Sequence, residues 1–225
     1  MGIRFQNGAV EISSRRQGRA ASQCREPRGW LGRLVLRNMN LRHSGVTDWG
    51  LGQIAVRAGD TVLDVGCGGG RTLAKLAGRA PAGTVYGVDH SPESVRVAGR
   101  VNRAGIAAGR VVVREASVMG LPFPAATFDL VTAVETHFWW PDLASGLREI
   151  HRVLKPGGTV ALIAEIHKGA PGRMAAVLER KLPATGLQLL SVQEHRAALA
   201  DAGFHEATVT TQGAWICATG RRTEG

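Results

Sequence analysis

Cysteines and long apolar runs are scarce in this chain, and each shortage excludes a class of protein. The three cysteines, Cys24, Cys67 and Cys217, lie far apart and form no CxxC or Cys/His pattern, which argues against both a zinc site and a disulfide framework. No run of about 18 apolar residues is present, so we expect no membrane-spanning segment. The N-terminus lacks the apolar core of a secretory signal, and small and polar residues follow Arg15-Arg16, where a twin-arginine signal would be hydrophobic. The sequence predicts a cytoplasmic protein without bound metal.

The positive charge is concentrated at one end of the chain. The formal charge is +10, and residues 1–40 supply +6 of it, with eight arginines against Glu11 and Glu26. A segment rich in Arg, Gly and Ser with little apolar periodicity is typical of a disordered tail, with an RNA- or acid-binding arm as the alternative and a start at Met39 as a third reading. The length of 225 residues and 44% hydrophobic content suit one core. We therefore expect a basic, disordered arm over 1–29 and a single domain over 30–225.

Strand and helix patterns alternate through most of the chain. Near-continuous apolar runs predict strands over 60–65, 84–89, 110–114, 128–134 and 159–164. Helical patterns follow over 70–78, 92–104, 141–154 and 191–202. Residues 31–51 predict one or two further short helices, the second capped by Thr47 or Asp48, and two final strands meet at Gln212-Gly213 in an antiparallel hairpin at the edge of the sheet. This order predicts a doubly wound α/β fold with a mostly parallel sheet.

The stretch VLDVGCGGG, residues 62–70, ends the first strand in a glycine loop. A ligand of an open α/β sheet lies at that position, beyond the carboxyl ends of the strands and at a helix N-terminus. The dinucleotide pattern GxGxxG fails because its sixth position is Arg71. Asp89 ends the second strand and can accept hydrogen bonds from two ribose hydroxyls. Asp64, within the strand before the loop, favours a ligand with a cationic amino group over one with a pyrophosphate.

Four blocks of sequence together resemble the class I S-adenosylmethionine-dependent methyltransferases, in their small-molecule, ubiquinone/menaquinone-type (methyltransferase-11-like) branch. The blocks are VLDVGCGGG (62–70), VYGVDHS (85–91), EASVMGLPFPAATFDLVTAVET (115–136) and EIHRVLKPGGTVALIAE (149–165). Four blocks in the right order and at the right spacing are a specific signal, whereas a glycine loop alone is weak. The resemblance implies a Rossmann-like fold, with N-terminal helices that form a lid and with S-adenosylmethionine as cofactor.

The resemblance also implies a set of cofactor-binding residues. Asp64 and the loop match the methionine-binding segment, Asp89 matches the ribose-binding acid, and Ser117 stands where the family has an adenine-binding aspartate. A serine can accept one hydrogen bond there, and the Val118 N–H can reach an adenine ring nitrogen. The full predicted set is Asp64, Gly66, Cys67, Gly68, Asp89, His90, Ser91, Ser117, Val118, Val134 and Glu135.

The stretch ETHFWWPD, residues 135–142, follows the fourth strand, where the acceptor pocket of such enzymes begins. Methyl transfer is an in-line displacement, so an enzyme mainly positions the acceptor and excludes water, and a base is needed only if the acceptor must lose a proton. His137 is a candidate base, with local packing as its alternative role, and Glu135 a candidate partner of cofactor or acceptor. The predicted acceptor wall and lid residues are Asn40, His43, Trp49, Trp139 and Trp140. For Trp49 the alternative is to anchor its helix to the sheet.

The leading hypothesis is an enzyme that methylates a small-molecule acceptor and releases S-adenosylhomocysteine. A second is an RNA or protein methyltransferase that docks through the arginine-rich arm. A third is a protein that binds the cofactor without methyl transfer, since a fold does not fix a function. The residues leave the acceptor atom and the oligomeric state open.

Overall fold

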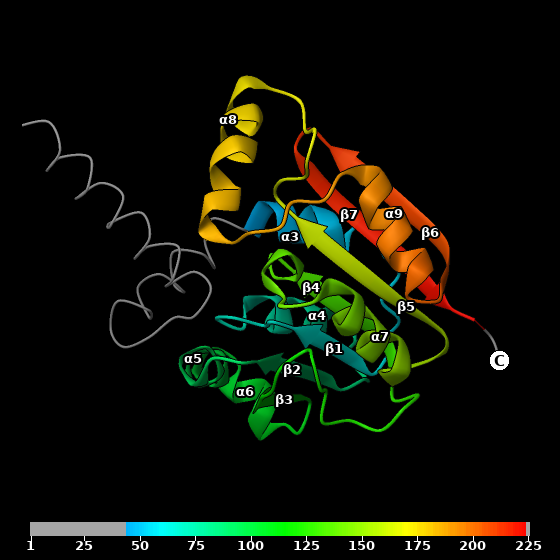
Figure 1. The fold of residues 1–225 in the computed structure, drawn as a ribbon. Helices are drawn as coiled ribbons and strands as arrows, with labels where there is room; N and C mark the ends of the chain where they lie inside the picture. Colours follow the sequence, from blue (N-terminus) through cyan, green and yellow to red (C-terminus); the bar gives the residue numbers. More distant parts are fainter. Residues whose placement is uncertain (1–43, 224–225) are drawn as a thin grey trace, which may run out of the picture.

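A seven-stranded mixed sheet forms the centre of the molecule in a computed structural model that describes residues 44–223 (Figure 1). The strand order is β3-β2-β1-β4-β5-β7-β6. The first five strands pair in parallel, and β7 pairs antiparallel to both β5 and β6. The strands are β1 (Val62–Val65), β2 (Val85–Asp89), β3 (Val111–Glu115), β4 (Phe128–Val134), β5 (Leu154–Ala164), β6 (Phe204–Gln212) and β7 (Trp215–Arg222). The predicted fold class and C-terminal hairpin are confirmed.

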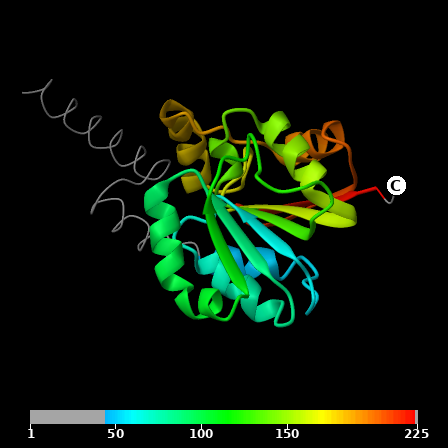
Figure 2. The ribbon, with the colours of Figure 1, turned by 90° about the horizontal axis from the view of Figure 1, so that it is seen from below.

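Helices cover both faces of the sheet (Figure 2). They are α3 (Ser44–Leu51), α4 (Arg71–Arg79), α5 (Pro92–Val101), α6 (Arg103–Ala107), α7 (Leu143–Val153), α8 (Arg173–Lys181) and α9 (Val192–Asp201), with 3₁₀ turns η1 (His137–Trp139) and η2 (Leu182–Thr185). Apolar side chains of α3, α4 and α5 pack on one face, and those of α7 and α9 on the other. Successive residues of β1 alternate accordingly, Val62 toward α4 and Leu63 toward α7. A strand buried on both faces must be apolar throughout, which is why these strands read as continuous runs.

Local capping explains where the helices begin. The Ser91 hydroxyl accepts a hydrogen bond from the Ser94 N–H at the start of α5, and Pro92 occupies its first turn. Asp142 caps α7, and Ser191 and Glu194 form a capping box at the start of α9. The helix α4 begins directly at the glycine loop and has no side-chain cap. Its first backbone N–H groups are therefore not satisfied by a capping side chain.

Three local predictions were wrong. Thr47 and Asp48 lie inside α3, which is already helical at Ser44, so neither caps it. The strand β5 begins at Leu154, before the predicted 159–164, because Leu154 pairs with Phe128 as soon as α7 ends. The helix α8, where the sequence pattern predicted no element, forms between a glycine without a side-chain cap and a 3₁₀ turn. The predicted arm over 1–29, together with Asn40 and His43, lies outside the described residues.

The order of the strands fixes where a ligand can bind. Connections from β1 lead outward through β2 to β3, whereas β4 and β5 lie on the opposite side of β1. Loops at the carboxyl ends of β1 and β4 therefore diverge, and a crevice opens between them. None of the helices in residues 44–223 is long and apolar enough to cross a membrane.

Candidate functional site

A cavity of about 250 Å³ opens at the carboxyl ends of β1, β2 and β4. The glycine loop, the start of α4, one end of α3 and the turn η1 form its walls. Most of the predicted site residues line it, namely Gly66, Cys67, Gly68, Asp89, His90, Ser117, Val118, Val134, Glu135, Trp139 and Trp140. Four segments that are distant in the sequence thus meet in one cavity.

The glycine loop is folded tightly against the end of β4. The N–H groups of Gly66 and Cys67 both donate to the Val88 carbonyl, at 2.8 and 3.0 Å. Gly66 has a φ of 73°, and a Cβ at this position would overlap the Thr136 hydroxyl. The loop therefore needs glycine at position 66 for both its backbone conformation and its space.

Replacing Gly66 with alanine should lower both stability and ligand affinity. Left-handed backbone costs an alanine roughly 1–2 kcal/mol, and overlap with Thr136 adds to this. We expect a loss of about 2–4 kcal/mol in the free energy of unfolding, measured by urea titration. The control is Gly78→Ala in α4, where a Cβ has open space. This substitution should raise the free energy of unfolding by at most about 1 kcal/mol. A Gly66→Ala protein as stable as wild type would contradict this account of the loop.

Asp89 anchors the loop from the neighbouring strand. One carboxylate oxygen accepts from the Gly68 N–H and the other from the Ser91 N–H, both at 2.9 Å. The carboxylate lines the cavity, and each oxygen retains a second lone pair for a ligand. Ser91 was predicted beside the adenine, but its side chain caps α5 and does not line the cavity. Ser94, one turn further along that helix, does line it.

Asp64 is a buried carboxylate beneath the loop. It does not line the cavity, although it was predicted in the cofactor site. One oxygen accepts from the Thr132 hydroxyl at 2.7 Å, and the other has no hydrogen-bond partner among the described residues. Burial raises the pKa of Asp64 to about 7, the Thr132 hydrogen bond opposes that rise, and the nearby Asp89 charge adds to it. An orphaned buried oxygen is costly unless a donor reaches it.

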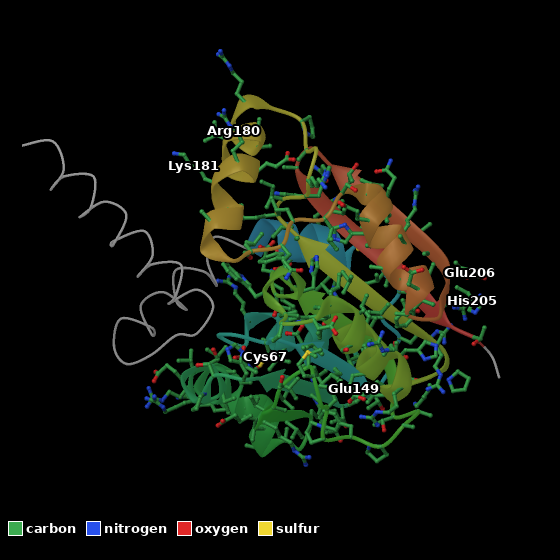
Figure 3. The ribbon with its side chains drawn as sticks, viewed as in Figure 1. Cys67, Glu149, Arg180, Lys181, His205 and Glu206 are labelled. Atoms are coloured by element: carbon green, nitrogen blue, oxygen red, sulfur yellow. The ribbon has the colours of Figure 1, made fainter. Side chains whose placement is uncertain are left out.

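Cys67 forms part of the cavity wall, and its thiol is expected to be unreactive. It is buried inside the fold (Figure 3), and burial and then the Asp89 and Asp64 carboxylates raise the pKa of its thiol well above the usual value. The thiolate is the reactive form of cysteine. Cys67 therefore contributes volume and shape to the site.

Glu135 ends β4 in an unusual backbone conformation. Its φ is 58°, its N–H donates to the Ile163 carbonyl at 2.9 Å, and its carboxylate accepts from the Glu165 N–H. A non-glycine residue held in this region costs about 1–3 kcal/mol and is typical of functional sites. The turn tilts the chain so that Glu135 and Thr136 face the cavity.

His137 lies elsewhere than predicted. Its ring is 3% exposed, does not line the cavity, and has its Nε2 atom 3.1 Å from Nε2 of His195 on α9. Burial, and secondarily the charge of His195, lower its pKa well below the usual value. A general base must reach the proton that it removes. The prediction of His137 as the base is therefore wrong on geometry.

The tryptophans divide between the cavity and the core. Trp139 and Trp140 line the cavity, and Trp140 rests on α7, where a Cβ at Gly146 would lie 2.8 Å from its ring. Trp49, predicted as a lid residue, does not line the cavity and contacts Trp215 at 5.9 Å between ring centroids. It anchors α3 to β7, which is the alternative role that the sequence had left open. Ser44 and Thr47 are the residues of α3 that reach the cavity.

Sequence reasoning missed several cavity residues: Ser44, Thr47, Arg71, Thr72, Lys75, Ser94, Thr136 and Pro141. The two cations carried a usable signal, because Arg71 and Lys75 are four residues apart on the helix that opens from the loop and must share a face. Lys75 donates to the Ser44 hydroxyl at 3.0 Å and to Asp48 at 2.6 Å. It thereby joins α4 to α3 across the rim of the site.

Comparison with known proteins decides the family. The pattern of the family described as "Methyltransferase domain" matches residues 63–162, from the second residue of β1 through the glycine loop to Leu162 in β5. Residues 63–162 therefore belong to the methyltransferase domain family.

Curated proteins similar to this chain include named methyltransferases. The 27-O-demethylrifamycin SV methyltransferase of Amycolatopsis mediterranei is 35% identical over 162 residues, which are 71% of this chain and 59% of the relative. The 2-phytyl-1,4-naphtoquinone methyltransferase of Nostoc punctiforme is 34% identical, over 54% of this chain and 53% of the relative. The chain spans between about half and two thirds of the length of the first curated relatives that it matches.

Solved structures of low identity share the methyltransferase fold. A chain in the complex of the Haloferax volcanii Trm112 methyltransferase activator with a methyltransferase superposes with a TM-score of 0.74 at 24% identity, covering 84% of this chain and 93% of that chain. The [4+2]-cyclase SpnF has a TM-score of 0.67 at 21% identity, covering 88% and 84%. At these identities the likeness concerns the fold alone.

The methyltransferase cofactor fits the residues present. The glycine backbone at positions 66 and 68 lines the cavity, and the carboxylate of Asp89 faces it. The buried oxygen of Asp64 lacks a donor among residues 44–223, and a cationic amino group would supply one. These three features match a ligand with an amino acid end and a ribose.

Proposed function

We propose that this protein transfers the methyl group of S-adenosylmethionine to a small, ring-bearing acceptor. The observation that carries the proposal is the set of residues that line this one cavity. Its glycine loop and Asp89 suit the cofactor, and two indole rings continue the same wall beyond Glu135. Two relatives whose names refer to a rifamycin and a naphthoquinone support an acceptor of this kind.

Each part of the cavity has a proposed role toward the cofactor. Asp89 binds the ribose hydroxyls, and Ser117 with the Val118 N–H binds the adenine next to His90. The Gly66 to Gly68 loop, with Asp64 beneath it, holds the methionine end. Val134 and Glu135 lie at the end of β4, beside the group to be transferred. Apart from Asp64, all of these residues line the cavity.

Trp139, Trp140 and Pro141 form the proposed acceptor wall. The flat faces of aromatic side chains favour offset stacking with a planar ring. Trp140 is 6% exposed and supported from behind by α7, so it offers a fixed surface. A rigid wall orients an acceptor, which is the main contribution that a protein makes to an in-line displacement.

The chain's own groups account for the remaining steps. The bound cofactor supplies an electrophilic methyl group attached to sulfur. The indole wall would exclude water and orient the acceptor in line with that methyl group. Glu135 is the carboxylate of the cavity nearest in sequence to the wall, and it takes the acceptor's proton where one must leave.

Calorimetric titration of the full chain with S-adenosylhomocysteine tests the proposal, with NAD as the control ligand. We expect saturable binding of the first ligand and none of the second, because the loop lacks the dinucleotide pattern at Arg71. Transfer of a labelled methyl group to ring-bearing acceptors would then be measured. A folded, ligand-free protein that does not bind S-adenosylhomocysteine would refute the assignment.

A further inference from the structure

Two buried histidines meet behind the acceptor wall. His137 is the first residue of η1, and His195 lies on α9, 58 residues away. Their side chains are almost completely buried, and the two Nε2 atoms are 3.1 Å apart. Neither ring lines the cavity, so the pair does not take part in binding or chemistry directly.

The surrounding contacts fix which nitrogen of each ring carries a proton. The Nδ1 atom of His195 is 2.8 Å from the Ser191 carbonyl, which can only accept, so this nitrogen donates. The neutral ring then accepts through Nε2, and His137 must donate from its own Nε2. The Nδ1 atom of His137 is left bare and buried, without a partner in residues 44–223. One directed chain of hydrogen bonds runs from His137 through His195 to Ser191.

This chain of hydrogen bonds starts at the turn that carries the wall. The Trp140 N–H donates to the His137 carbonyl at 3.3 Å, and the two rings are 6.4 Å apart. The Phe138 carbonyl accepts from the Gln188 N–H at 3.0 Å. The turn η1 is thus held by a side-chain hydrogen bond to α9 and by a backbone hydrogen bond to Gln188, in the segment that precedes α9.

We propose that His137 and His195 form a positioning pair, which holds the turn η1 and thereby sets the orientation of Trp139 and Trp140 toward the acceptor. The inference rests on the proposed function only in calling this surface the acceptor wall. His137 acts through the indoles and does not touch the reacting atoms.

The same geometry makes the wall sensitive to acid. A second proton on His195 would point at the donor of His137, or would force the His137 proton onto Nδ1, where no acceptor is available. Burial lowers the pKa of both rings. The other titratable groups near the pair are His167, whose charge opposes protonation of His195, and Glu194, whose charge favours it. The wall should therefore be fixed at neutral pH and loosen only once the pH falls below the lowered pKa of His195.

Two substitutions of His137 separate the proposed role from simple packing. In His137→Gln the side-chain amide can donate to neutral His195, and after rotation it can accept from protonated His195. The wall should keep its neutral-pH orientation and lose its acid transition. In His137→Phe the link is absent, so the wall should be altered at every pH. His205 on β6, exposed at the outer edge of the sheet (Figure 3), supplies the matched controls His205→Gln and His205→Phe.

The wall is followed by fluorine NMR of the full chain labelled with 5-fluorotryptophan, the Trp139 and Trp140 signals being assigned with W139F and W140F. We expect an acid transition of these signals in wild type and in both His205 variants, none in His137→Gln, and shifted signals in His137→Phe at pH 7.5. Nitrogen NMR of the wild-type imidazoles should show His195 protonated at Nδ1 and His137 at Nε2. Wild-type Trp139 and Trp140 signals without an acid transition, or the opposite tautomers, would overturn the proposal even if His137→Phe does not fold.

Calorimetry with S-adenosylhomocysteine keeps the two proposals separate. The affinity of His137→Gln should stay within about threefold of wild type, because the pair lies outside the cofactor part of the cavity. Failure of wild type to bind this ligand would refute the proposed function. The tautomers and the acid transition of the tryptophan signals would still test the positioning pair. A tenfold loss of cofactor affinity in His137→Gln with unchanged wall signals would overturn the positioning role.

Discussion

Asp89→Ala should reduce the affinity for S-adenosylhomocysteine about 100-fold or more. A carboxylate that accepts two ribose hydroxyls contributes roughly 1.5–3 kcal/mol for each hydrogen bond. The substitution also removes the acceptor of the Gly68 N–H and the Ser91 N–H. Both effects lower ligand affinity: the ribose loses its hydrogen-bond acceptor, and the glycine loop loses the carboxylate that holds it in place. Calorimetric titration at pH 7.5 measures the effect directly.

Asp129→Ala is the matched control for Asp89. Asp129 also accepts a backbone N–H, that of Thr61, and pairs with Lys155, but it lies at the start of β4 and does not line the cavity. Its removal should leave ligand affinity within about twofold of wild type. Asp89→Asn keeps one acceptor oxygen and should give an intermediate loss. Wild-type affinity in Asp89→Ala would rule out the ribose assignment.

Asp64→Asn should change stability and ligand binding in opposite directions at pH 8. The pKa of Asp64 is raised from the ordinary 3.8 to about 7 in the folded protein. Between these two values the unfolded chain binds fewer protons than the folded one, so wild-type stability falls as pH rises through this window and levels off above 7. From pH 5 to pH 8 this group alone removes about 2–3 kcal/mol. Asparagine does not ionise, so this loss is absent in the variant.

The stability difference between Asp64→Asn and wild type isolates this group. Other ionisable groups, including the buried histidines, titrate in both proteins and cancel. Urea unfolding of the ligand-free proteins should show the variant gaining about 2–3 kcal/mol relative to wild type between pH 5 and pH 8. A difference that does not change with pH would mean that Asp64 ionises normally in the folded state.

The same variant should bind S-adenosylhomocysteine more weakly. In the proposed site the carboxylate under the loop pairs with the cationic amino group of the ligand, and an uncharged amide would bind that group more weakly. We expect about a tenfold loss at pH 8, and an affinity that rises with pH through 7 in wild type but not in the variant. Equal affinities at pH 8 would remove Asp64 from the cofactor site.

The sequence predicts those features whose causes are local or repetitive. The strand Phe128–Val134 forms with the predicted bounds, and the glycine loop lies where its residues indicate. Continuous apolar runs mark buried parallel strands, and a loop of glycines marks close backbone approach. These signals are contained in a few neighbouring residues, so tertiary packing did not overrule them.

The errors concern residues whose roles depend on a distant partner. His137 was misassigned because its partner, His195, is far along the chain and no local pattern links them. Trp49 was placed in a lid because its contact with Trp215 exists only once β7 inserts between β5 and β6. The spacing of residues in a single 3₁₀ turn does not predict which way each side chain points. The sequence therefore did not show that His137 faces the core while Trp139 faces the cavity.

The close approach of Thr136 to Gly66 decides which positions of the site can be varied in protein engineering. The Thr136 hydroxyl occupies the space against which the cofactor loop closes, and the same residue begins the segment that becomes the indole wall. A library that varies position 136 would disturb donor and acceptor together. Positions 139 to 141 are separated from the loop by a complete turn. Substitutions there should change which acceptors fit while leaving the proposed cofactor part of the site intact.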